Sequence, residues 1–101
     1  MTRLIARHVA REMHFEWDRE KASANLRKHR VAFDEAATVF YNPLAATFGD
    51  PDHSGGERRF LSIGYSSGGR LLVVSHVERG SLIRIISARL ASAKERKRHE
   101  T

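Results

Sequence analysis

Four runs of β-forming residues in the second half of the chain constrain its fold more than any other feature. They are rich in β-branched and aromatic side chains and occupy residues 44–48, 59–65, 70–77 and 82–88. Short segments with turn chemistry separate them, namely Asp50-Pro51-Asp52, Ser66-Ser67-Gly68-Gly69 and Arg79-Gly80-Ser81. Consecutive strands joined by short turns pair antiparallel, so the pattern predicts an antiparallel meander.

Helical periodicity follows a short predicted strand, residues 15–17, in the first half of the chain. Asp18 suits the N-cap of a helix that runs to about His29, because its carboxylate can accept hydrogen bonds from the amides of the first turn. Residues at i, i+3, i+4 and i+7 predict the inward stripe of this helix. They are Ala22, Asn25, Leu26 and His29.

A second, shorter helix repeats this spacing with Phe33, Ala36, Ala37 and Phe40. Asn42-Pro43 ends it, because proline has no amide proton to donate and restricts the residue before it. Residues 91–100 are predicted to form a charged C-terminal helix. The order of elements predicts an α+β fold in which the two N-terminal helices pack on one face of the antiparallel sheet.

The length of 101 residues allows one domain. We place it at residues 13–101 and treat residues 1–12, which precede a second methionine, as an N-terminal extension with no assigned order or function. Cysteine is absent, which excludes disulfides and cysteine chemistry and fits a reducing cytoplasm. No stretch approaches the roughly 20 apolar residues that cross a bilayer, so no membrane association is expected.

Positive charge concentrates in the second half of the chain. The formal net charge is +6, and residues 51–101 hold ten Lys or Arg against five Asp or Glu. Basic side chains neutralise phosphates and release counterions, which favours a nucleic acid as partner. The alternative is a soluble surface that is merely basic.

Several segments, taken together and in order, resemble the BrnT toxin family. Those that carry the resemblance include Phe15-Glu16-Trp17-Asp18, Lys28-His29, Phe33-Asp34-Glu35-Ala36, Asp50-Pro51-Asp52-His53-Ser54, Val73-Val74-Ser75-His76, Glu78-Arg79 and Arg84-Ile85-Ile86-Ser87-Ala88-Arg89. The resemblance implies a RelE-like ribonuclease fold, activity against RNA, and a cognate BrnA-like antitoxin. It also implies binding of operator DNA only through the antitoxin complex, in which the toxin can be dimeric.

Two positions depart from the family pattern. Arg30 replaces the glycine that usually ends the first helix, and a left-handed conformation there strains any residue with a Cβ atom. Ala32 replaces the Ser or Thr that usually caps the second helix, so we expect either no side-chain cap or a start two residues later at Asp34. Both departures concern folding rather than chemistry.

The last two strands contain the residue types that RNA cleavage without metal requires. These are a proton acceptor and donor, and cations for the crowded phosphate. We predict catalytic roles for His76, Glu78, Arg84 and Arg89. A three-residue loop, Arg79-Gly80-Ser81, places His76 opposite Arg84, whereas a two-residue loop, Arg79-Gly80, turns Arg84 to the other face.

Each of these residues also has a purely structural explanation. His76 can be an ordinary strand residue, Glu78 can pair with Arg79, and Arg89 can cap the sheet. Arg84 interrupts an apolar strand, which is costly unless its side chain reaches a partner or a ligand.

Further basic residues are candidates for binding RNA. They are Lys28, His53, Arg79, Lys94 and Arg98. Lys28 is equally explained by the helix dipole, and Lys94 and Arg98 by a solvated helix face. The histidines lack paired ligand spacing, so no metal or other cofactor is expected. The sequence thus predicts a metal-independent endoribonuclease toxin that arrests growth; the alternative is a noncatalytic module that binds nucleic acid or the antitoxin.

Overall fold

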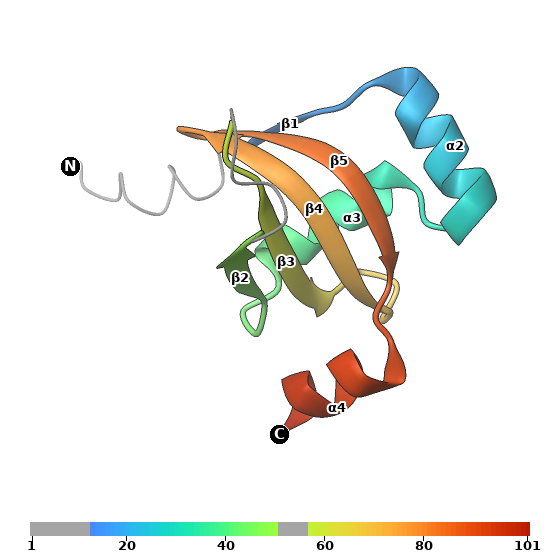
Figure 1. Ribbon diagram of the computed structural model, residues 1–101, viewed down its shortest axis with the longest axis vertical. Helices are drawn as coiled ribbons and strands as arrows, with labels where there is room; N and C mark the ends of the chain where they lie inside the picture. Colours follow the sequence, from blue (N-terminus) through green and yellow to red (C-terminus); the bar gives the residue numbers. More distant parts are fainter. Residues whose placement is uncertain (1–12, 51–56) are drawn as a thin grey trace.

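The computed structural model describes residues 13–50 and 57–101 (Figure 1). In chain order the elements are β1 (His14–Glu16), α2 (Arg19–His29), α3 (Phe33–Thr38), the 3-10 turn η1 (Val39–Tyr41), β2 (Ala46–Gly49), β3 (Phe60–Tyr65), β4 (Leu71–Arg79), β5 (Leu82–Leu90) and α4 (Ala93–Glu100). The extension at 1–12, the turn expected at 51–52 and the candidate His53 lie outside the described residues. No helix in the described ranges is long and apolar enough to span a membrane.

The strands form one mixed sheet in the order β1-β5-β4-β3-β2. Strands β2 to β5 are the antiparallel meander that the sequence predicts. β1 adds to the far edge and runs parallel to β5, with His14 opposite Leu82, a pairing that the sequence pattern does not reveal. The predicted α+β class is confirmed, with a mixed rather than purely antiparallel sheet.

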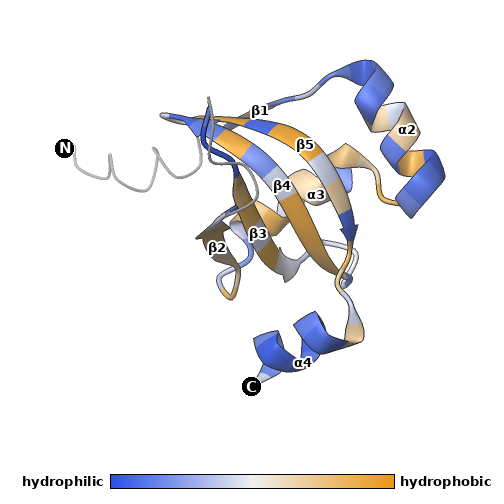
Figure 2. Ribbon diagram, in the orientation of Figure 1, coloured by the Kyte–Doolittle hydropathy of each residue, from blue (hydrophilic) through white to orange (hydrophobic). Residues whose placement is uncertain are grey.

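One face of the sheet is covered by α2, α3 and η1 (Figures 1 and 2). The core lies between these helices and strands β4 and β5. Its buried side chains are Val31, Phe33, Ala36, Val39, Leu72, Val74, Ile83, Ile85 and Ala88. We call this side the helix face and the opposite side the open face. A smaller cluster on the open face contains Ile63, Leu71 and Val73.

Helix α2 begins as predicted, with the carboxylate of Asp18 accepting from the amide of Lys21 at 3.0 Å. Asn25 is its buried residue, and it satisfies backbone groups on two other segments. Its amide donates to the carbonyls of Val31 and Ala88, and its carbonyl accepts from the amide of Ala88. Leu26, predicted to face inward, is 48% exposed. The prediction is wrong at Leu26 alone, because Ala22, Asn25 and His29 are the buried or half-buried residues of α2 and the contact with β5 is made by Asn25.

The connection between α2 and α3 shows both departures from the family pattern. Arg30 adopts the left-handed conformation, with φ 60° and ψ 33°. Helix α3 starts at Phe33 with Ala32 as an N-cap that makes no side-chain hydrogen bond, so the alternative start at Asp34 is wrong. The guanidinium of Arg70 donates to the carbonyl of Arg30 and to Glu35, which holds this strained connection against the β3–β4 turn.

We expect Arg30→Gly to stabilise the protein by about 1 kcal/mol, because glycine adopts this conformation without a Cβ clash. For a domain of this size the melting temperature should rise by roughly 4–8 °C. Arg30→Ala is the matched control, since it removes the same side chain but keeps the Cβ atom and the backbone contact to Arg70. Equal melting temperatures for the two variants would show that the left-handed conformation carries no strain.

Helix α4 lies beside the open face and buries no residue of its own. Ser92 and Glu95 form a capping box at its start. The helix is attached by polar contacts, because Arg89 binds Glu95 with two hydrogen bonds, of 2.8 and 3.0 Å, and the Tyr65 hydroxyl donates to Glu100 at 2.6 Å. Figure 2 shows α4 as hydrophilic along nearly its whole length.

Candidate active site

The β4–β5 hairpin does not have the predicted register. Its turn consists of Gly80 and Ser81, and Gly80 has a φ of 62°, so Arg79 pairs with Leu82. His76 is therefore opposite Ile85 and Arg84 is opposite Val77. The expected three-residue loop is wrong by one residue, and a one-residue slip moves a side chain to the other face of the sheet. His76 lies on the helix face and Arg84 on the open face.

A β-bulge then places both arginines of β5 on the open face. Ser75 pairs with Ser87 but His76 pairs with Ile85, so Ile86 is the extra residue. Arg84 and Arg89 share a face although they are five positions apart, an odd spacing that would otherwise place them on opposite faces. They lie about 16 Å apart along the strand. Arg84 pairs with Glu16 of β1 at 2.9 Å, and Arg89 pairs with Glu95, so each reaches a carboxylate at a different end of β5.

His76 is fully buried between two aromatic rings. Phe40 of η1 meets its edge at a centroid distance of 4.8 Å, and Phe60 of β3 stacks on it at 5.9 Å. Burial disfavours the charged imidazolium and lowers the pKa of His76 to about 4. The ring is thus neutral near pH 7 and does not reach solvent.

A chain of polar side chains crosses the helix face through His76. Its Nε2 lies 2.8 Å from the hydroxyl of Ser62, which lies 2.7 Å from the hydroxyl of Thr47. On the other side Nδ1 lies 3.4 Å from Oε2 of Glu78 and has no hydrogen-bond partner among the described residues. We call these four side chains the Glu78–Thr47 relay.

The direction of the Glu78–Thr47 relay follows from the carboxylate. An ionised Glu78 can only accept, so the favourable tautomer of His76 carries its proton on Nδ1. Nε2 then accepts from Ser62, and the Ser62 oxygen accepts from Thr47. Glu78 is 40% exposed and Thr47 is also exposed, so the relay is buried in its middle and open at both ends.

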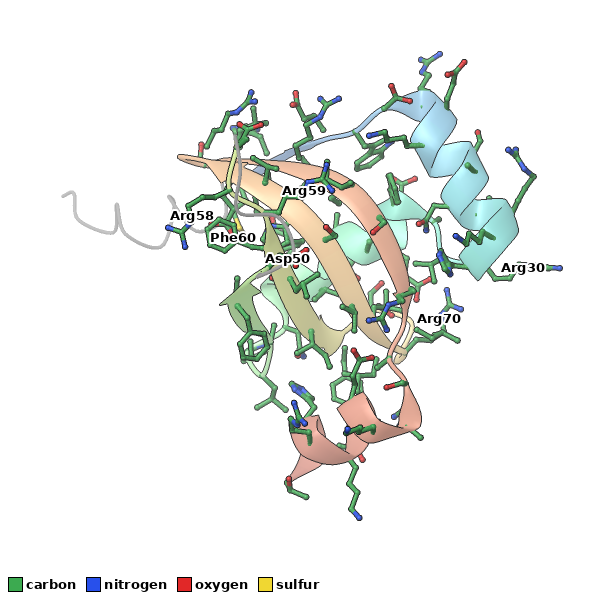
Figure 3. All side chains as sticks on the ribbon, in the orientation of Figure 1. Arg30, Asp50, Arg58, Arg59, Phe60 and Arg70 are labelled. Carbon is green, nitrogen blue, oxygen red and sulfur yellow. The ribbon has the colours of Figure 1, made fainter. Side chains whose placement is uncertain are left out.

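Basic side chains gather where β3 begins and β4 ends. The guanidinium of Arg58 lies over the ring of Phe60 at 5.2 Å, on the same ring that stacks against His76. Figure 3 shows Arg58 and Phe60 together at this end of the sheet, with Arg59 close by. Arg79 is at the same end and pairs with Glu57. Of the predicted site, the structure therefore brings together Glu78 and His76, whereas the side chain of Arg79, the next residue on β4, lies on the open face.

The other predicted RNA-binding residues are dispersed. Lys28 is exposed in the last turn of α2, and Lys94 and Arg98 are exposed on α4. Within residues 13–50 and 57–101, no group of three or more His, Asp or Glu side chains is arranged to hold a metal ion. The arrangement supplies a carboxylate and guanidinium groups, which suit proton transfer and phosphate binding.

Sequence reasoning missed Ser62, Thr47 and Arg58. Ser62 does have a signal in the sequence, because it is a polar residue between the apolar residues Leu61 and Ile63. In the structure its side chain is buried on the helix face, whereas those of its two neighbours lie on the open face. A buried polar side chain needs a partner, which points across the sheet to β4. Arg58 gave no such signal, since its position depends on the strand start.

Comparison with known proteins identifies the class as ribonuclease toxins of type II toxin–antitoxin systems. The profile of the family described as "Ribonuclease toxin, BrnT, of type II toxin-antitoxin system" matches residues 17–95. The chain belongs to the BrnT family, which confirms the resemblance seen in the sequence.

A solved structure supports the same assignment. The 1.1 Å crystal structure of the Brucella abortus ribonuclease toxin BrnT is similar to this chain with a TM-score of 0.58 and 25% identity. The match covers 79% of this chain and 97% of the Brucella chain. No curated protein matches the sequence.

Proposed function

We propose that this ribonuclease toxin cleaves RNA internally without a metal ion and that a cognate antitoxin neutralises it. Membership of the BrnT family supports both the role as a toxin and RNA as the substrate. The observation that favours chemistry at a particular place is the half-exposed carboxylate of Glu78 against the unpartnered Nδ1 of buried His76, next to the Phe60 ring that carries the Arg58 guanidinium. Growth arrest follows from loss of translated RNA.

In the proposed reaction a ribose 2′-oxygen attacks the adjacent phosphorus. Glu78 takes the proton of the 2′-hydroxyl, and the bond from phosphorus to the 5′-oxygen breaks. The 5′-oxygen takes up a proton from water, the hydroxide so formed takes the proton back from Glu78, and a 2′,3′-cyclic phosphate is left. Arg58, whose guanidinium lies over the Phe60 ring that stacks on His76, would stabilise the negative charge of the phosphate, and Arg79 at the end of β4 would reach it from the open face. Such charge stabilisation is the task a metal ion would otherwise perform.

His76 acts through Glu78 in this proposal rather than on RNA. Its ring is fully buried, so contact with substrate would require the aromatic rings of Phe40 and Phe60 to move. From its buried position Nδ1 can orient the carboxylate, which lies 3.4 Å away. Arg84 remains a candidate for phosphate if it exchanges Glu16 for RNA, whereas the contact of Arg89 with Glu95 explains its position without RNA.

The partners proposed here follow from the type II class of the family. A cognate antitoxin, BrnA-like as the resemblance implies, would bind the toxin in the cytoplasm. Operator DNA would be contacted only through that complex, in which the toxin can occur as two copies. The excess of basic residues in the chain favours association with RNA and with an acidic antitoxin.

Cleavage under chelation tests the proposal directly. Purified toxin is incubated with a 5′-labelled RNA in EDTA, and the products are separated on a denaturing gel. We expect discrete internal fragments ending in a cyclic or 3′-phosphate, with equal rates in EDTA and in Mg²⁺. Activity that returns only with Mg²⁺ would refute metal independence. Intact RNA that is shifted on a native gel would instead support the noncatalytic binding module.

A further inference from the structure

The open face carries an apolar groove that the site at Glu78 does not use. Its volume is about 550 Å³, and helix α4 forms one wall. The floor consists of side chains from β2, β3 and β4 that alternate onto this face. They are Ala46, Phe48, Leu61, Ile63 and Val73. We call this feature the α4 groove.

Two large apolar side chains are exposed in the α4 groove. Leu44 is 69% exposed and Phe48 is 57% exposed, and both line it. Single exposed apolar residues are normal on a protein surface, but a contiguous set that lines one groove indicates a binding surface. A ligand that covered these side chains would remove their exposed apolar surface from water, which favours binding.

The charged residues in the wall of the α4 groove favour an occupant of opposite charge. Three residues of α4 line it, Glu95, Arg98 and His99. The carboxylate of Glu95 is already held by Arg89 with two hydrogen bonds, and this contact lowers its pKa to about 2. Its charge is therefore matched within the chain, whereas Arg98 has no ion pair among the described residues. The rim presents positive charge, so an acidic partner complements it.

We propose that the α4 groove binds an amphipathic, acidic segment of the cognate antitoxin. The apolar stripe of that segment would cover Leu44 and Phe48, and its carboxylates would face Arg98. The inference rests on the neutralisation proposed above and adds the surface through which it occurs. This surface lies on the opposite face of the sheet from the Glu78–Thr47 relay, so the bound antitoxin does not need to touch Glu78.

Two other occupants fit the groove less well. RNA binds through phosphate contacts and stacking on aromatic rings, and the floor of the groove is aliphatic except for Phe48. A second copy of the chain would bring two basic rims together on chains that each carry a net charge of +6, which disfavours the contact.

The test uses two charge substitutions in the groove and a matched one outside it. Phe48→Glu and Leu44→Glu place a carboxylate on the apolar floor, and both side chains are exposed enough for the fold to accept the change. Leu26→Glu makes the same change at a 48% exposed leucine on α2, outside the groove. The probe is the purified small protein encoded beside the toxin gene. Its dissociation constant from each toxin is measured, together with RNA cleavage in its absence.

We expect Phe48→Glu and Leu44→Glu to weaken antitoxin binding at least about tenfold and Leu26→Glu to leave it within about twofold. All three variants should cleave RNA at the wild-type rate when no antitoxin is present. Thermal unfolding verifies the fold of each variant, and Leu44→Glu alone suffices if Phe48→Glu is unfolded.

Each contrary outcome has a distinct meaning. If the neighbouring protein does not inhibit the wild-type toxin, the proposed neutralisation fails and the groove proposal fails with it. If it inhibits wild type and both groove variants equally, only the groove proposal is overturned. Loss of RNA cleavage with antitoxin binding intact would make the groove an RNA surface. A wild-type dimer that the substitutions convert to monomer would make the occupant a second copy.

Discussion

Replacing Glu78 with glutamine should reduce RNA cleavage by about 10²–10⁴-fold, the range typical of a lost general base. Glutamine keeps the shape of the side chain and presents a carbonyl oxygen toward Nδ1 of His76, but it cannot take the proton of a 2′-hydroxyl. The side chain is 40% exposed, so the fold should survive. Single-turnover cleavage of a fluorescent RNA, with toxin in excess, measures the effect on the chemical step.

Glu20→Gln is the matched control for this experiment. Glu20 is an exposed carboxylate in the first turn of α2, and its replacement should leave the cleavage rate within about twofold. RNA binding by both variants should match wild type, so that the loss at Glu78 appears in the rate and not in the affinity. A Glu78→Gln toxin that cleaves within about threefold of wild type would remove Glu78 from the site.

The second large effect is the loss of folding stability at acidic pH that results from the burial of His76. The unfolded imidazole titrates near 6.5, whereas burial lowers the folded pKa to about 4, so between these values the unfolded chain binds more protons. Stability from this group is complete above about pH 6.5 and is lost as the pH falls toward 4. The loss amounts to roughly 3 kcal/mol, from about 1.4 kcal/mol for each pKa unit. Glu78 faces the ring, but its exposure to water screens the attraction that would oppose this shift.

Urea unfolding at pH 7 and at pH 4.5, in wild type and in His76→Gln, isolates this contribution. Glutamine does not titrate, so the stability of the variant should fall less between the two pH values. Carboxylates with lowered pKa, such as Glu35 and Glu95, lose their stabilisation in both proteins and cancel in the comparison. Equal losses in the two proteins would contradict the buried neutral state of His76.

The sequence predicted elements well because their signals are local. The strand runs of the second half, the Asp18 cap and the stop at Asn42-Pro43 all depend on a few neighbouring residues, and the structure confirms each. The unfavourable features at Arg30 and Ala32 were also visible, since each departs from the residue type that the local backbone prefers. The family assignment rested on an ordered set of such segments.

The arrangement of the site was predicted less well because it depends on register. A hairpin turn of two residues and one of three differ little in sequence, yet they place Arg84 on opposite faces. The bulge at Ile86 has no compositional marker. The burial of His76 depends on Phe40 and Phe60, which come from distant parts of the chain. The catalytic roles assigned from sequence remain predictions for the experiments above.

The bulge at Ile86 also determines how the gene for this chain can change in length. β5 consists of two stretches of opposite phase, and the extra residue joins them so that Ile85 and Ala88 both face the helices. Deleting the Ile86 codon would remove the bulge and restore strict alternation along β5, with Arg84 and Arg89 both still on the open face. A substitution at Ile86 removes only its own contacts. The position should therefore tolerate both exchange of its side chain and deletion of the residue, whereas deletion of a residue from an unbulged stretch of a central strand would turn the remainder of that strand over.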